Sequence, residues 1–154
     1  MVSVLVIYYS RGGRTKAMAD AIVEGAESVE GATGSAKRVD YATIADLVDC
    51  DAVAFGSPNY FSYMAGLMKD YFDRGLGVRG KTEGKPGAAF TSGGGDSDAA
   101  LQSLERMIGS YKLEKVADGI ISSGDPSEDD LKKCKAMGAA LAKVAQKRAE
   151  EPTE

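Results

Sequence analysis

Near its N-terminus the chain has an apolar run, then a glycine loop, then a helical pattern, and this order limits the folds that the chain can adopt. Residues 4–8 are apolar and mostly β-branched, which predicts a buried strand. A short polar loop follows, with Gly12 and Gly13 side by side. From residue 15 to about residue 29, apolar side chains recur at helical spacing, which predicts a helix with one buried face. Strand, glycine loop and helix in this order have the geometry of an anion site.

The chemistry of the loop suits a phosphate group. The first N–H groups of a helix lack intrahelical partners, and the positive end of the helix dipole points at the loop. Glycine lets a phosphate approach the backbone, and the hydroxyls of Ser10 and Thr15 can donate hydrogen bonds. Arg11 and Arg14 add positive charge. The alternative is an ordinary tight turn in which Thr15 caps the helix. This stretch alone leaves both interpretations open.

Size and charge narrow the class of protein. A chain of 154 residues is long enough for one domain with a real core, which we expect over 1–149, with a frayed tail over 150–154. The net charge of -4 argues against nucleic acid as a partner. No apolar run approaches the roughly 20 residues of a membrane span. The N-terminus lacks the pattern of a signal peptide, so we expect a cytoplasmic protein.

Histidine is absent, which removes the commonest general base and the commonest transition-metal ligand. Cys50 and Cys134 are far apart and belong to no pair motif, so neither a disulfide nor a metal site is favoured. Cys134 falls on the apolar face of the last expected helix and is expected to be a buried free thiol. Any chemistry therefore comes from carboxylates, hydroxyls, lysines or a cofactor.

The rest of the chain alternates between strand and helix patterns. The expected strands are 2–8, 35–39, 52–56, 87–91 and 115–122, and the expected helices are 15–29, 43–48, 65–76, 99–108 and 127–149. Residues 75–86 are expected to form a surface loop. In the third helix we expect Leu67, Met68, Tyr71 and Phe72 to point inward. The last helix should start with a capping box of Ser127 and Asp130. Its buried stripe should consist of Leu131, Cys134, Met137, Leu141 and Val144.

Five strands that alternate with five helices predict an α/β domain with a parallel sheet covered on both faces. Ligands of such sheets bind beyond the carboxyl ends of the strands. Unusual loops over 10–15, 57–63 and 91–97 follow the first, third and fourth strands. These loops should therefore lie together at one edge of the sheet.

The second and third loops suit a flat ring. Asn59, Tyr60 and Phe61 offer aromatic faces and a polar edge, while the glycines before Asp96 expose backbone groups that can bind a heterocycle. Together with the first loop, they predict a mononucleotide with a planar aromatic head. The alternative is that Tyr60 and Phe61 only pack against the start of the next helix.

The sequence resembles the flavodoxin-like family over essentially its full length. The motif at 9–15 is similar to the family's FMN-phosphate loop. The motifs at 56–61, 64–66 and 90–95 are similar to the loops that flank the isoalloxazine in the branch containing the WrbA-type NAD(P)H:quinone oxidoreductases. The resemblance implies a three-layer fold with a five-stranded parallel sheet, strand order 2-1-3-4-5, helices on both faces, and non-covalently bound FMN.

Carried over by motif, the resemblance also implies the cofactor-binding residues. The phosphate group would be held by Ser10, Gly12, Gly13, Arg14 and Thr15, with Arg11 in the same loop and its side chain free to point to solvent. The ring would be flanked by Pro58, Asn59, Tyr60 and Phe61. Its pyrimidine side would be lined by Ser92, Gly93, Gly94, Gly95 and Asp96, with Thr91 directly before them.

Four other classes of protein do not fit this chain. A response-regulator receiver needs acidic residues after the first strand, where this chain has Tyr9 and Ser10. A Walker motif and a dinucleotide fingerprint bind phosphate only between a strand and a helix, and the residues 75–82 that match both patterns follow an expected helix in the expected surface loop. A low-molecular-weight phosphatase needs a cysteine in the first loop, and that loop has none.

Two uses of FMN remain open. WrbA-type enzymes carry an added segment between the later strands and a histidine near the flavin, whereas this chain is shorter and has no histidine. Flavodoxins proper usually stack tryptophan or tyrosine on the ring amid acidic residues, whereas tryptophan is absent here and Arg11 and Arg14 stand opposite Asp96 and Asp98. We expect an electron carrier, monomeric or weakly self-associating, with redox partner proteins. A small reductase that uses NAD(P)H and a quinone or flavin is the alternative.

Overall fold

A computed structural model describes residues 1–151, so the expected tail falls largely outside the described residues. The strands are β1 (Val2–Tyr8), β2 (Ala32–Arg38), β3 (Ala52–Pro58), β4 (Pro86–Ser92), β5 (Glu114–Lys115) and β6 (Ile120–Ser122). The helices are α1 (Arg14–Glu27), α2 (Ile44–Asp49), α3 (Gly66–Arg74), α4 (Ser97–Ser110) and α5 (Glu128–Glu150), with a 3₁₀ helix over Leu76–Lys81. All strand pairs are parallel, in the order β2-β1-β3-β4-β5, which confirms the expected topology.

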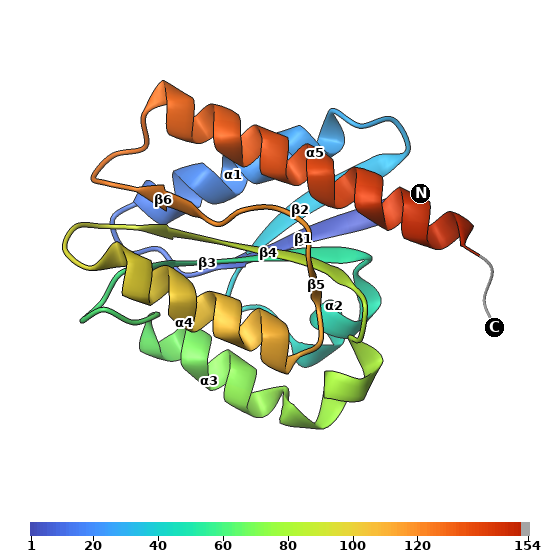
Figure 1. Ribbon diagram of the computed structural model, residues 1–154, viewed down its shortest axis with the longest axis horizontal. Helices are drawn as coiled ribbons and strands as arrows, with labels where there is room; N and C mark the ends of the chain where they lie inside the picture. The colour runs from blue at the N-terminus through green and yellow to red at the C-terminus, as the bar shows by residue number, and fades with distance from the viewer. Residues whose placement is uncertain (152–154) are drawn as a thin grey trace.

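The helices cover both faces of the sheet, as Figure 1 shows. Helices α1 and α5 lie on one face, where they pack on alternate side chains of β1 such as Val4 and Val6. Helices α2, α3 and α4 lie on the other face, where Leu5 and Ile7 point. The central strands are buried on both sides, which explains why they are almost continuously apolar in sequence.

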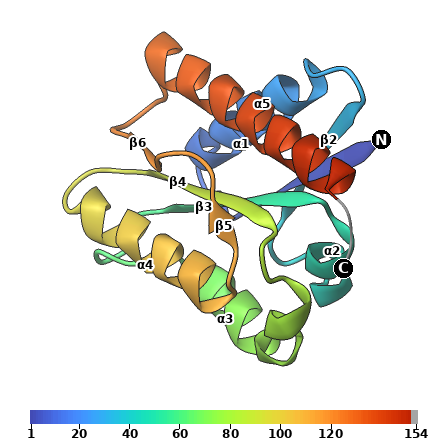
Figure 2. The ribbon, with the colours of Figure 1, turned by 45° about the vertical axis from the view of Figure 1, so that its right-hand side comes forward.

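Helices α1 and α5 lie side by side on their face of the sheet in both Figure 1 and Figure 2. Two glycines allow this close approach. A Cβ atom on Gly25 would lie 1.9 Å from the carbonyl oxygen of Lys135, and one on Gly138 would lie 1.9 Å from the carbonyl oxygen of Ile22. A glycine of each helix therefore packs directly against the backbone of the other helix.

The predicted strand over 115–122 is wrong as a continuous element. It divides into β5, which pairs with Pro86 and Gly87, and β6, which pairs with the end of β4 from Phe90. Residues 116–119 leave the ladder between the two pieces and include Asp118 and Gly119, both poor strand formers. The expected surface loop over 75–86 also needs correction, because its first half forms the 3₁₀ helix.

Burial of the helix faces agrees with the predictions except at three positions. Met68, Tyr71 and Phe72 are buried, but Leu67 is 44% exposed because it lies on the outer side of the first turn of α3. In α5, Leu131 and Val144 are only half-buried, while the rest of the predicted stripe is buried. The Ser127–Asp130 capping box is present, with both reciprocal hydrogen bonds at 3.0 Å. Cys50 and Cys134 are buried free thiols.

Candidate functional site

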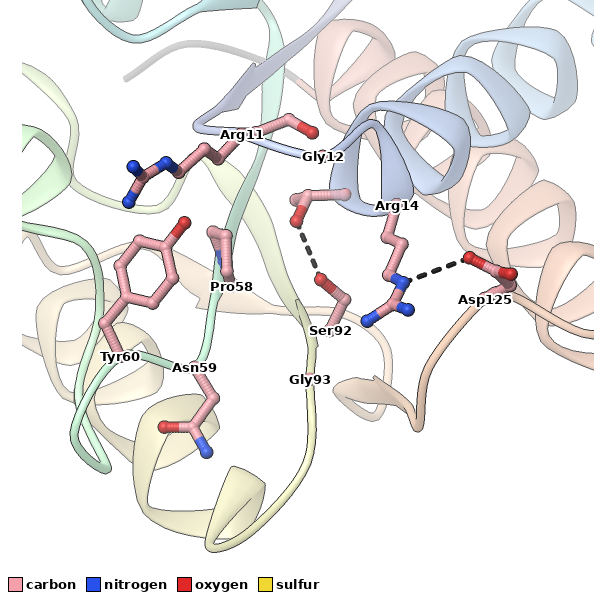
Figure 3. A pocket seen from close by; sticks show the side chains of 11 residues that line it. Arg11, Gly12, Arg14, Pro58, Asn59, Tyr60, Ser92, Gly93 and Asp125 are labelled. Atoms are coloured by element: carbon pink, nitrogen blue, oxygen red, sulfur yellow. Dashed lines mark hydrogen bonds and ion pairs between the residues drawn. The ribbon is translucent and has the colours of Figure 1, made fainter.

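The three unusual loops meet at the carboxyl edge of the sheet, as predicted. They line most of a cavity of about 430 Å³. A fourth loop, between β6 and α5, lines the remaining side. The lining residues are Ser10, Arg11, Gly12, Arg14, Thr15, Pro58, Asn59, Tyr60, Ser92, Gly93 and Asp125, shown in Figure 3.

Helix α1 begins at this cavity without a side-chain cap. Its N-cap is Gly13, at a φ of 94°, so the interpretation of Thr15 as the cap is wrong. Helices α2, α4 and α5 all have side-chain caps, from Thr43, Asp96 and Ser127 respectively. The first N–H groups of α1 therefore remain available for a ligand, and no acidic side chain in the first turn repels an anion.

The backbone of the first loop is open to the cavity. A Cβ atom on Gly12 or Gly13 would meet nothing within 4 Å, and Gly12 lines the cavity, so a ligand can reach its peptide group. The hydroxyl oxygen of Ser10 accepts a hydrogen bond of 3.1 Å from the Gly13 N–H, which leaves its own hydrogen to donate. This arrangement is the cradle that an anionic group needs.

Buried hydroxyls hold the loops in register. The Thr15 and Ser92 hydroxyl oxygens lie 2.8 Å apart and join the start of α1 to the end of β4. The Thr91 hydroxyl donates to the Ser57 carbonyl oxygen at 2.7 Å, and the Ser57 hydroxyl accepts from the Ala65 N–H at 2.7 Å. Thr91 does not line the cavity, and its contact supports the neighbouring loop.

On the ring side, Asn59 ties the second loop to the third. Its backbone N–H donates to the Ser92 carbonyl oxygen at 2.7 Å, and its side-chain Nδ2 donates to the Gly94 carbonyl oxygen at 2.6 Å. Its Oδ1 is buried and has no hydrogen-bond partner among residues 1–151. Tyr60 follows, in edge contact with Tyr9 at 6.3 Å between ring centroids. The two loops thus form one connected wall.

Several predicted site residues lie outside the cavity: Gly13, Phe61, Thr91, Gly94, Gly95 and Asp96. Phe61 is fully exposed at the tip of a turn that Tyr60 and Tyr63 close with hydrogen bonds of 3.0 and 3.1 Å. The carboxylate of Asp96 accepts the Ala99 N–H and caps α4. The roles proposed for these residues toward the ring stay predictions.

Asp125 lines the cavity although none of the sequence motifs includes it. It lies between β6 and α5, and its carboxylate accepts a hydrogen bond of 3.0 Å from Arg14 Nε. Only the rule that the carboxyl ends of parallel strands share an edge could have directed attention to the loop after β6. In Figure 3, Arg11 extends toward the Tyr60 side of the cavity, whereas Arg14 extends toward Asp125 on the opposite side.

The cavity fits FMN on the observations above. An uncapped helix end and an open glycine backbone suit the phosphate group, and Tyr60 with the polar wall around Asn59 suits a heterocyclic ring. Residues 1–151 contain no group of three or more acidic or cysteine side chains placed to hold a metal ion. None of their helices is both long and apolar enough to cross a membrane. Fold and site together define a mononucleotide-binding α/β protein.

Comparisons with known proteins agree with this class. The family model described as NADPH-dependent FMN reductase matches residues 33–116. A flavodoxin from Aquifex aeolicus is 35% identical over 159 residues, which cover 92% of this chain and 86% of that protein. An NAD(P)H dehydrogenase (quinone) from Rhodopseudomonas palustris is 32% identical over 195 residues, which cover 94% of this chain and 98% of that protein. The solved structure of a flavodoxin from the domain Archaea superposes with a TM-score of 0.85 at 26% identity, covering 94% and 99% of the two chains.

The chain therefore belongs to the flavodoxin-like family of FMN-binding proteins. This confirms the resemblance on which the cofactor and the strand order were predicted.

Proposed function

We propose that this protein is an electron carrier that exchanges electrons with partner proteins through its non-covalently bound FMN. FMN supplies the redox chemistry when bound, because its ring takes up and releases electrons reversibly. The polypeptide holds the cofactor, orients it and sets the charge around it. We further infer that the protein works as a monomer or a weak homo-oligomer, which sedimentation of the FMN-loaded protein would test.

The observation that carries the carrier proposal is the short connection between β5 and β6. Only residues 116–119 link the two strands, so no added segment stands there to build a second substrate site beside the ring. The fully exposed Phe61 at the rim of the cavity leaves this side open to a protein partner. An open rim is what a carrier needs, since its partner must approach the cofactor closely.

Different residues of the site would bind the phosphate group and the ring of FMN. Ser10 and the first N–H groups of α1 would hold the phosphate group, which their free donors support. Asn59 keeps the two ring-side loops together through its bond to the Gly94 carbonyl oxygen. Arg11 places a positive charge on the Tyr60 side, which favours negative charge on whatever binds there.

A reductase that uses NAD(P)H and a quinone or flavin is the second candidate. Arg11 favours it, because a cation on the Tyr60 side of the cavity stabilises a reduced, negatively charged flavin. The family model that matches the chain, described as NADPH-dependent FMN reductase, supports the same alternative.

Rapid mixing of the FMN-loaded protein with NADPH or NADH separates the two candidates. For a carrier we expect slow bleaching of the flavin absorbance by either nucleotide and fast reduction by a reductase protein. Bleaching within milliseconds by one nucleotide, followed by recovery of the colour on adding a quinone, would establish the reductase and reject the carrier. A protein that takes up no FMN would reject both candidates.

A further inference from the structure

We propose that Asp125 is a positioning residue that orients the guanidinium of Arg14 toward the phosphate group of FMN. This inference rests on the FMN site described above and assigns a role to a loop that none of the sequence motifs includes. The role is indirect: Asp125 acts through Arg14, and Arg14 meets the ligand.

The geometry of the pair leaves the binding end of Arg14 unused. Nε of Arg14 donates to the Asp125 carboxylate at 3.0 Å. This is the one side-chain hydrogen bond that Arg14 makes to the described residues, so its two terminal nitrogens have no partner there. Figure 3 shows these nitrogens on the Ser92 side of the cavity, while Nε faces Asp125. A guanidinium held by Nε still presents its terminal N–H groups, which is the fork that binds a phosphate group.

The Arg14–Asp125 ion pair is exposed to solvent, so it contributes little to folding stability. The side chain of Arg14 is 52% exposed and that of Asp125 is 89% exposed. Exposed pairs of this kind contribute about 0–1 kcal/mol to folding. A role in ligand binding explains the pair better than a role in folding. An arginine that is already held in its bound orientation loses less conformational freedom when the ligand binds.

The position of Arg14 strengthens the assignment. Arg14 is the first residue of α1, and the uncapped N–H groups of that helix line the same end of the cavity. Without Asp125, the flexible side chain of Arg14 would sample solvent. With Asp125, the guanidinium stays at the cavity that Ser10 and the start of α1 also line, so all three can contribute to binding a dianionic group.

The carboxylate of Asp125 also lines the cavity and repels a phosphate dianion. If this repulsion dominated, Asp125 would weaken FMN binding and its removal would strengthen it. The two roles therefore predict opposite signs for the same substitution.

The test measures the affinities of the apoprotein for FMN and for riboflavin, which lacks the phosphate, by calorimetric titration. For Asp125→Ala we expect about tenfold weaker FMN binding and unchanged riboflavin binding. Asp125→Asn should recover most of the loss, because its amide oxygen still accepts from Nε. In an Arg14→Ala background, Asp125→Ala should cause no further loss. Asp98→Ala, an exposed acidic position in the first turn of α4 that does not line the cavity, is the matched charge control and should leave both affinities unchanged.

Tighter FMN binding by both Asp125→Ala and Asp125→Asn would overturn the inference in favour of simple repulsion. An equal loss for FMN and riboflavin, no loss at all, or a loss that persists without Arg14 would also overturn it. These results presuppose that the wild-type protein binds FMN. If it does not, the proposed function falls first, and the inference falls with it.

Discussion

The hydroxyl oxygens of Thr15 and Ser92 lie 2.8 Å apart across 77 positions of sequence. Thr15 is 1% exposed and Ser92 is 2% exposed, so neither hydroxyl can turn to bulk water. The bond joins the start of α1 to the end of β4 directly beneath the cavity. It thereby fixes the phosphate end of the site relative to the ring end before any ligand binds.

Substitution of either hydroxyl should destabilise the apoprotein. Thr15→Val keeps the shape of the side chain but leaves the buried Ser92 hydroxyl without this partner, which we expect to cost about 1–3 kcal/mol. Ser92→Ala should have a similar effect. The double variant should lose clearly less than the sum, because no unpaired hydroxyl remains. Urea unfolding of the four apoproteins measures these differences. Additive losses would show that the two hydroxyls do not depend on each other.

Gly12 and Gly13 provide a matched pair in the first loop. Neither position has an atom within 4 Å of an added Cβ, but only Gly13 has a positive φ, of 94°. Gly13→Ala should therefore destabilise the apoprotein by about 1 kcal/mol through backbone strain. Gly12→Ala should leave its stability unchanged and instead weaken FMN binding, because the methyl group occupies space that a ligand would use. Unfolding measures the stability of both variants, and titration measures their affinity for FMN. A Gly12→Ala variant that binds FMN as tightly as the wild type would show that the phosphate group binds elsewhere.

Close packing of α1 on α5 makes their glycines sensitive to substitution. The Cβ of Gly25→Ala would lie 1.9 Å from a backbone oxygen of α5, so the helices must separate, and we expect a loss of about 3 kcal/mol or more. Gly138→Ala should be equally damaging. Gly109 in α4 is the control, since an added Cβ there meets nothing within 4 Å. Gly109→Ala should stabilise the protein by about 0.5–1 kcal/mol through helix propensity. Thermal unfolding of the three variants tests this ranking.

Burial of Cys134 predicts a loss of stability at alkaline pH. Desolvation raises the pKa of this thiol from 9.0 to about 12. Between these values the unfolded chain has lost the thiol proton while the folded chain retains it, so the free energy of unfolding falls as pH rises from 9. Cys134→Ala should show a shallower decline over this range than the wild type, as measured by urea unfolding at each pH. Parallel declines would mean that other groups account for the alkaline instability.

Phe61 and Tyr60 should respond differently to substitution. Phe61 is fully exposed and has a φ of 55°, so Phe61→Gly should stabilise the apoprotein by about 1 kcal/mol and leave FMN affinity unchanged. Tyr60 lines the cavity, and Tyr60→Ala should weaken FMN binding. Fluorescence titration of FMN compares the two variants. Weaker FMN binding in Phe61→Gly would show that Phe61 folds over the ring when the cofactor binds.

Local sequence patterns were enough to predict the type and order of most elements. Continuous apolar runs identified the central strands, and apolar spacing at three to four positions identified the helices and placed Met68, Tyr71 and Phe72 inside. Turn residues located three of the four loops around the cavity. These patterns are local, because periodicity and turn propensity depend on residues that are close together in the sequence.

The side chains that meet across the cavity could not be predicted from local patterns, because they come from distant parts of the chain. Arg14 and Asp125 are 111 positions apart, and no local pattern marks the loop after β6 as part of the site. The same holds for the bond from Asn59 to Gly94, and for Phe61, whose exposure depends on the path of its turn. Spacing predicts which face a residue occupies within its own element. The distance between two loops depends on how the whole sheet twists and packs, and that is a property of the folded chain.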